Sequence, residues 1–153
     1  MEVQDVMNKR PIKVRKGDYI LDIVKKFQDK RIRAAPICDG DTLVGVVSEK
    51  DILDFMEVHE FGSKLWLPAP FDFIEAVLSA KEEVHEIEND FAKLKHATAE
   101  EIMGEYPKVV SPDDHVSAVA DIMSEYEETL VPVVDNDVLV GIVTRTDLIK
   151  TLL

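Results

Sequence analysis

The sequence LVGVVSEKDIL at residues 43–53 recurs almost unchanged as LVGIVTRTDLI at residues 139–149, ninety-six positions further along the chain. When the chain is compared with itself at this spacing, residues 1–57 align with residues 97–153 without a gap. Twelve of these positions are identical, and about a third of the others exchange one apolar residue for another. The chain of 153 residues therefore contains an internal duplication.

Each copy has the pattern of a short strand, a helix, a two-strand hairpin and a final helix. The strands are predicted at PIKV, AAPIC and TLVGVV in the first copy, and at PKVV, LVPVV and VLVGIV in the second. The hairpin turns are DGD and DND, and the final helices are EKDILDFM and RTDLIKTLL. The other helix of each copy follows the start signals Asp18 and SPDD (111–114). It is predicted from apolar residues at helical spacing, which are Ile20, Ile23, Val24 and Phe27, and then Val116, Val119, Ala120 and Met123. The pattern predicts an α/β fold of two β-α-β-β-α copies that pack through their sheets, because one copy alone is too small to be stable.

The segment at 58–97 separates the two copies and is more than a simple tether. It begins with an aromatic-rich cluster, and from about Asp72 its apolar residues recur at helical spacing. We therefore expect a first copy at 1–57, a loop and helical insertion at 58–97, and a second copy at 98–153. The insertion either completes the core as an additional helix, or serves as a lid, a dimer contact or a docking surface for an effector protein.

The charge of the chain is acidic and unevenly distributed. The formal net charge is −13, which argues against binding to nucleic acid. The first copy carries 11 acidic and 11 basic residues, whereas the second carries 12 acidic and 3 basic residues. No apolar run approaches the roughly 18 residues that a membrane span needs, and no secretory signal is visible. The only cysteine, Cys38, reads as a buried strand residue, so we expect a cytoplasmic protein.

The repeated stretch ends in a hydroxyl residue followed three positions later by an aspartate. These residues are Ser48 and Asp51 in the first copy and Thr144 and Asp147 in the second. One interpretation is a helix capping box without any ligand. The other is a ligand site, in which the hydroxyl bonds a phosphate oxygen and the carboxylate accepts two hydrogen bonds from a ribose diol. A glycine three positions before each hydroxyl residue would allow close backbone approach.

The two copies resemble the CBS domain, a family named for cystathionine β-synthase. The resemblance rests on AAPICDGDTLVGVVSEKDI (34–52) and LVPVVDNDVLVGIVTRTDL (130–148). Both contain a proline-centred strand, a turn and a Gly-apolar-apolar-Ser/Thr-x-x-Asp ending. CBS domains occur as tandem pairs called Bateman modules, and the resemblance covers about 114 of the 153 residues. It implies a stand-alone CBS pair, since no catalytic domain remains once the pair is removed.

The resemblance also implies a set of ligand-binding residues. The hydroxyls of Ser48 and Thr144 would contact phosphate, and Asp51 and Asp147 would contact the ribose of an adenosine-containing ligand. The adenine slot would be lined from the first strand by Ile12, Lys13, Lys108 and Val109, and from the second by Ala35, Pro36, Val131 and Pro132. The basic side chains that could reach phosphates are Arg33, Lys50 and Arg145. The position equivalent to Arg33 in the second copy is the uncharged Thr129.

The sequence predicts a sensor rather than an enzyme. It has no nucleotide-hydrolysis loop, nucleophile elbow or Cys/His metal cluster, so we expect no catalytic residue, no metal and no required cofactor. The expected function is a regulatory module that binds AMP, ADP or ATP and passes the signal to an unknown effector protein. The alternatives are a binder of S-adenosylmethionine or methylthioadenosine, and a purely structural dimerisation or interaction module without a ligand.

Two further expectations follow from the unequal charges of the copies. We expect a homodimer, because CBS pairs generally form disc-like dimers, and head-to-tail pairing would avoid opposing two acidic second copies. We also expect ADP or ATP to prefer the first site, because Arg31, Arg33 and Lys50 lie in the first copy.

Overall fold

The computed structural model describes residues 1–56 and 95–153, so the predicted insertion and its aromatic cluster lie almost entirely outside the described residues. By their contacts, the residues divide into two compact units. The first unit contains residues 1–16, 34–46 and 104–153, and the second contains residues 17–33 and the described part of 47–103. Each unit is described by itself. No helix in the described part of the chain is long and apolar enough to cross a membrane.

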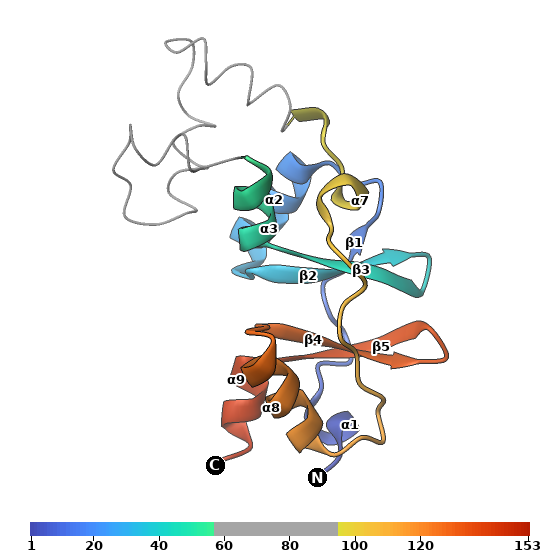
Figure 1. Ribbon diagram of the computed structural model, residues 1–153, viewed down its shortest axis with the longest axis vertical. Coiled ribbons are helices and arrows are strands. Elements are labelled where there is room, and N and C mark those ends of the chain that lie inside the picture. Colours follow the sequence, from blue (N-terminus) through green and yellow to red (C-terminus); the bar gives the residue numbers. More distant parts are fainter. Residues whose placement is uncertain (57–94) are drawn as a thin grey trace. The chain divides into compact units, whose positions relative to one another are not determined.

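The first copy contains the helices and hairpin expected from its sequence (Figure 1). Helix α2 spans Ile20–Lys30 and buries all four of the apolar residues that predicted it. It ends at Arg31, which has the left-handed conformation (φ 54°) typical of a helix C-terminus. Strands β2 (Ala34–Asp39) and β3 (Thr42–Ser48) form the hairpin, and helix α3 (Glu49–Phe55) follows directly. The hairpin turn contains Gly40 at φ 62°, a conformation that glycine adopts without strain.

The second copy repeats this order with one difference in the buried face of its helix. Helix α8 spans Val116–Glu125, strands β4 and β5 span Leu130–Asp135 and Val138–Thr144, and helix α9 spans Arg145–Lys150. Val119 and Met123 of α8 are buried as expected, but Val116 is only half-buried and Ala120 is exposed. The helix instead turns Ala118 and Ile122 toward the core, so the predicted face was displaced in this copy.

The described strands form one mixed sheet in the order β1-β2-β3-β5-β4. Strand β1 is only Val14–Arg15, and its counterpart in the second copy is a single bridge between Val110 and Val133. The predicted strands at PIKV and PKVV are therefore shorter than expected. Val14 pairs with Ile37 in parallel, which is the same register ninety-six positions earlier.

The hairpins of the two copies share an apolar cluster in the first unit. Cys38 and Leu43 of the first copy lie in it together with Leu130, Val134, Leu139 and Ile142 of the second. Thr42 also pairs with Val138 across the antiparallel strands β3 and β5. The expected packing of the copies through their sheets is therefore confirmed, and so is the buried strand position of Cys38.

A second apolar cluster shows that the copies exchange their first residues. Helix α1 (Val3–Val6) belongs to the first copy, yet Val3 is fully buried among Val119, Val131 and Val143 of the second. Helix α1 contacts α8 and β5 (Figure 1). Conversely, helix α7 (Ala99–Ile102) begins the second copy but contacts α3 of the first. We call residues 1–8 and 97–104 the exchanged arms.

The backbone hydrogen bonds of the exchanged arms are equivalent in the two copies. The Val3 N–H donates to the Asp114 carbonyl at 2.8 Å, and the Ala99 N–H donates to the Asp18 carbonyl at 2.9 Å. Val3 and Ala99 are equivalent positions of the repeat, ninety-six residues apart, and so are Asp18 and Asp114. The duplication therefore includes both the arm and the backbone that it binds. Nothing in the sequence pattern predicted that the arms would be exchanged between the copies.

Candidate functional site

Ser48 and Asp51 form a closed hydrogen-bonded pair at the junction of β3 and α3. Residue 48 ends the strand in an extended conformation and caps the helix. Its N–H and its hydroxyl both donate to Oδ2 of Asp51, each at 2.8 Å, and the Asp51 N–H donates back to the Ser48 hydroxyl at 3.3 Å. The arrangement is a capping box, and both residues are half-buried.

Thr144 and Asp147 form the equivalent pair at the junction of β5 and α9. The Thr144 N–H donates to Oδ2 of Asp147 at 2.8 Å, and the Thr144 hydroxyl donates to the same oxygen at 2.7 Å. The register places Thr144 opposite Leu130, next to the pair of Val131 and Val143. The carboxylate is therefore fixed at the beginning of the helix, and the Thr144 that holds it lies opposite the first residue of β4.

This geometry decides part of the chemistry open to each pair. Because the hydroxyl proton is already given to the aspartate, the hydroxyl presents its lone pairs outward and can accept a hydrogen bond. A phosphate oxygen could be bound by this hydroxyl only after the hydroxyl turns away from the aspartate. No partner for Oδ1 of Asp51 or Asp147 lies among residues 1–56 and 95–153, so this oxygen can accept hydrogen bonds from a ligand hydroxyl. The predicted capping box is thus observed in both copies, and it uses only Oδ2 of each carboxylate.

The other predicted residues of the second site lie around the same end of β4. The Val110 N–H donates to the Pro132 carbonyl at 3.1 Å, which brings Lys108 and Val109 alongside β4. Val131 and Pro132 are buried, Val109 is half-buried and Lys108 is exposed. These residues precede the bridge at Val110 rather than lying in a strand. The structure therefore brings the predicted second site together from three chain segments.

The predicted residues of the first site fall into two groups. Ile12 and Lys13 precede β1, and its pairing with β2 brings them alongside Ala35 and Pro36 in the first unit. Ala35 and Pro36 are buried, Ile12 is half-buried and Lys13 is exposed. The remaining members of this site, Arg33, Ser48, Lys50 and Asp51, belong to the second unit.

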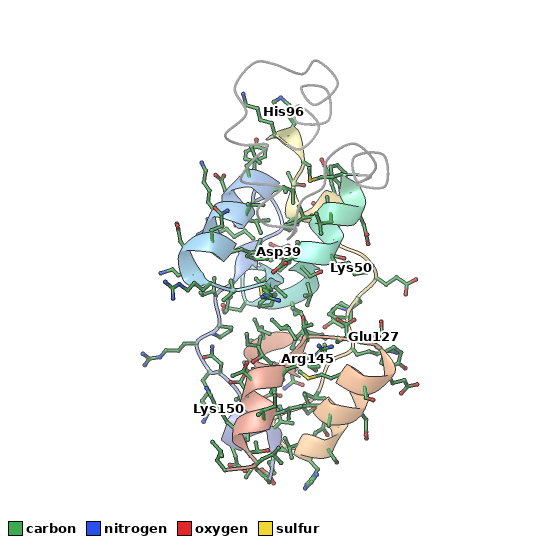
Figure 2. The ribbon with its side chains drawn as sticks, turned by 90° about the vertical axis from the view of Figure 1, so that its left-hand side faces the viewer. Asp39, Lys50, His96, Glu127, Arg145 and Lys150 are labelled. Carbon is green, nitrogen blue, oxygen red and sulfur yellow. The ribbon has the colours of Figure 1, made fainter. Side chains whose placement is uncertain are left out.

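The basic residues predicted to reach phosphate differ in their partners. Nε of Arg33 lies 3.5 Å from a carboxylate oxygen of Glu49, and Nζ of Lys50 lies 2.9 Å from Oδ2 of Asp54. Arg145, at the beginning of α9 in Figure 2, is exposed and forms no ion pair with any described residue. Burial raises the pKa of the Glu49 carboxyl, and the Arg33 guanidinium offsets part of that rise.

Two contacts near these sites had no signal in the sequence. Glu49 pairs with a residue sixteen positions earlier, and Nζ of Lys108 lies 4.9 Å from the centre of the Tyr126 ring. The close approach expected at Gly141 is made by an exchanged arm, because a Cβ there would lie 2.7 Å from Sδ of Met7. An ion pair or a ring contact between distant positions cannot be inferred from local spacing.

The family of the chain follows from a comparison with known proteins. The CBS domain family model matches residues 3–58 and residues 99–153, so the chain belongs to the CBS domain family. The two matches correspond to the two copies of the internal repeat, and the described structure is a CBS-domain pair.

Individual relatives and solved structures support this assignment. An uncharacterized protein of Methanocaldococcus jannaschii, MJ1426, is 33% identical over all of this chain and 92% of its own length. The CBS domain of a CBS domain containing membrane protein from Sphaerobacter thermophilus is 31% identical with a TM-score of 0.73, covering 100% of this chain and 88% of that one. The CBS domain pair of protein MJ0100, solved in complex with 5′-methylthioadenosine and S-adenosyl-L-methionine, is 27% identical with a TM-score of 0.66, covering 99% and 95%.

Proposed function

We propose that this chain is a regulatory module that binds an adenosine nucleotide (AMP, ADP or ATP) and passes the signal to a partner protein. The observation that carries the proposal is the fixed aspartate of each copy, of which Oδ2 is held by the cap and Oδ1 has no hydrogen-bond partner among residues 1–56 and 95–153. A ribose diol supplies hydroxyl donors of the kind that this oxygen can accept. In the second copy, Val109 is half-buried alongside β4, and it offers an apolar side chain for contact with a base.

A second candidate ligand class is a sulfur-containing adenosine. The CBS domain pair of MJ0100 is 27% identical to this chain and was solved with 5′-methylthioadenosine and S-adenosyl-L-methionine. These compounds share the adenosine with AMP but have no phosphate. The aspartate and the apolar side chain would serve both classes, so the choice between them depends on the charged side chains around Ser48 and Thr144.

The proposed role of the hydroxyl and the carboxylate is binding rather than catalysis. The hydroxyls of Ser48 and Thr144 donate to aspartates that also accept a backbone N–H, and these bonds hold each carboxylate in place at the beginning of its helix. Regulation would follow if the ligand binds two arrangements of the module with different affinities. The effector protein and a second copy of the chain are the proposed receivers of that change.

Calorimetric and thermal-shift titrations test the proposal. We would titrate AMP, ADP, ATP, 5′-methylthioadenosine and S-adenosylmethionine into the wild type, Asp51→Ala, Asp147→Ala and the double variant. A ligand at about 100 times its dissociation constant should stabilise the wild type by about 2.7 kcal/mol. Each single substitution should remove one binding event, and the double variant should bind nothing.

The matched control is Asp22→Asn, which changes an exposed carboxylate in the first turn of α2 without touching either capping box. It should bind as the wild type does. If none of the five compounds binds the folded wild type, the ligand-binding function fails and a structural interaction module is favoured. If the wild type released phosphate from ATP steadily and Asp51→Ala abolished that release, the chain would be an enzyme rather than a sensor.

A further inference from the structure

The position after the hydroxyl residue has opposite charge in the two copies. It is Glu49 after Ser48 in the first copy and Arg145 after Thr144 in the second, at equivalent places in the repeat. Arg33, which pairs with Glu49 in the first copy, corresponds to the uncharged Thr129 in the second. The net charge of Arg33 and Glu49 together is zero, whereas that of Thr129 and Arg145 together is +1.

In the first copy, Glu49 lies against the residues that the phosphate would need. Its N–H donates to the Arg33 carbonyl at 3.0 Å, and its carboxylate lies 3.5 Å from the Arg33 guanidinium. The side chain of Glu49 is only 18% exposed, whereas that of Arg33 is 88% exposed. The carboxylate is therefore held at the junction beside Ser48, while the guanidinium extends into solvent.

The next turn of α3 adds no net positive charge to the first copy. Lys50 is paired with Asp54 at 2.9 Å, so the two basic side chains proposed to reach phosphate are both held by carboxylates. In the second copy, Arg145 forms no ion pair with residues 1–56 or 95–153, and α9 ends in Lys150 (Figure 2). The second junction is thus the more positive of the two, although the second copy has the more negative overall charge.

We propose that Glu49 and Arg145 are the residues that determine the ligand specificity of the two sites. The first site admits an adenosine compound without phosphate, such as 5′-methylthioadenosine, and the second admits AMP. This inference rests on the proposed function and extends it by giving each site its own ligand class. It reverses the order expected from counting basic residues in the sequence, because Arg33 and Lys50 are already occupied.

The physical reason is that the first junction would repel the phosphate of AMP, whereas the second would attract it. A phosphate beside Ser48 would meet the Glu49 carboxylate, and like charges in close contact disfavour binding. The same group beside Thr144 would meet the Arg145 guanidinium, which binds phosphate in a bidentate manner. A neutral ligand experiences neither effect, so the comparison of AMP with 5′-methylthioadenosine isolates the contribution of the phosphate.

The test uses the full-length chain with one site disabled at a time. In the Asp147→Ala background, which leaves the first site, Glu49→Gln should tighten AMP binding about tenfold, with a change of less than about twofold for 5′-methylthioadenosine. In the Asp51→Ala background, which leaves the second site, Arg145→Gln should weaken AMP binding about tenfold and leave 5′-methylthioadenosine within about twofold. Affinities are measured by calorimetry, and thermal unfolding confirms that each variant is folded.

Matched controls remove exposed charges that lie away from the two junctions. Asp22→Asn in the first turn of α2 and Lys150→Gln in the last turn of α9 should leave the ratio of AMP to 5′-methylthioadenosine affinity unchanged at both sites, because neither residue lies at a junction. Equal effects of Glu49→Gln on the two ligands, or of the control substitutions on AMP, would overturn the specificity proposal while leaving the binding function intact. If the wild type binds neither ligand, the proposed function fails, and the specificity proposal fails with it.

Discussion

At the scale of single residues, the same atoms serve as a helix cap and as a candidate binding group. Oδ2 of Asp147 accepts both the N–H and the hydroxyl of Thr144, so the carboxylate cannot turn away without exposing two donors at the beginning of α9. A ligand would meet a carboxylate whose orientation is already fixed, which reduces the entropy lost on binding. The capping role and the proposed binding role are therefore compatible.

The pH dependence of stability should report the burial of Glu49. Burial raises the pKa of this carboxyl above its ordinary value of 4.5, so the folded chain holds the proton more tightly than the unfolded chain does. Ionisation of Glu49 therefore lowers the free energy of unfolding as the pH rises from the ordinary pKa through the raised one. Denaturant unfolding of Glu49→Gln and of the wild type should show the variant gaining relative stability across this range. A relative stability that falls with rising pH would contradict the assignment.

The thiol of Cys38 should be unreactive in the folded protein. The side chain is 3% exposed in the cluster that joins the hairpins, and burial raises its pKa, with Lys13 offsetting part of the rise. Since the thiolate is the reactive form, iodoacetamide should label the native protein far more slowly than the chain in denaturant. Mass spectrometry measures both rates. Rapid, complete labelling of the native protein would show that the cluster opens readily.

At the scale of elements, the exchanged arms are the part of the fold with the clearest energetic consequence. Val3 is fully buried among residues of the second copy, although it lies in a four-residue helix that could not be stable alone. Backbone hydrogen bonds also hold the arm. The Asn8 N–H donates to the Ile142 carbonyl at 2.8 Å, and the Ile142 N–H donates to the Asn8 carbonyl at 3.1 Å. Packing against the core, rather than helix propensity, stabilises α1.

Val3→Ala should lower the free energy of unfolding by about 2 kcal/mol, because two buried methyl groups are lost and a cavity remains. The control is Val138→Ala, at a strand position that is 39% exposed, which should cost well under half as much. Denaturant unfolding with a common m-value measures both. Equal costs would mean that the arm is not part of the core.

Gly141→Ala tests the same arm from the opposite side. The added Cβ would lie 2.7 Å from Sδ of Met7 and 3.0 Å from the Asn8 carbonyl oxygen. The methionine can move but the backbone carbonyl cannot easily do so, and we expect a cost of about 1–3 kcal/mol, as for other overpacked sites. The second substitution Met7→Ala should recover part of this loss. No loss in the single variant would show that the arm is loosely held.

The sequence predicted those elements whose signal is local. The hairpins, α2 and the strand–helix junctions follow from spacing and turn residues, and all are observed. The displaced face of α8 and the exchange of the arms depend on which surface each segment meets, and spacing within the segment does not carry that information. For the candidate site, the repeat identified Asp51 and Asp147, whereas the contact of Arg33 with Glu49 required the two ends of β2 and β3 to be placed side by side.

At the scale of the whole molecule, the two copies are mutually dependent. A copy that is separated from the other loses the exchanged arm that packs against it. The cluster of Cys38 and Leu43 with residues of β4 and β5 is also lost. The reciprocal bonds of Val3 and Ala99 make this dependence symmetric. The pair, rather than the single copy, is therefore the folding unit.

Separate production of residues 1–96 and residues 97–153 tests this dependence. The fragment 97–153 alone should show no cooperative thermal unfolding by circular dichroism, because it lacks the Val3 side chain and the whole first hairpin. Mixing it with the fragment 1–96 should restore a cooperative transition whose midpoint rises with concentration. A cooperative transition of either fragment alone would contradict the mutual dependence.

The exchanged arms also determine the order in which the molecule can be assembled during synthesis. Residues 1–8 leave the ribosome before the second copy does, but the carbonyl that receives the Val3 N–H belongs to Asp114, and the strand that pairs with Asn8 is made later still. At a typical synthesis rate of about 5–20 residues per second, the arm waits for several seconds without its partner. During that interval its apolar side chains are available to chaperones or to an arm from another nascent chain. Translation speed across the segment between the copies would therefore influence the yield of correctly folded protein.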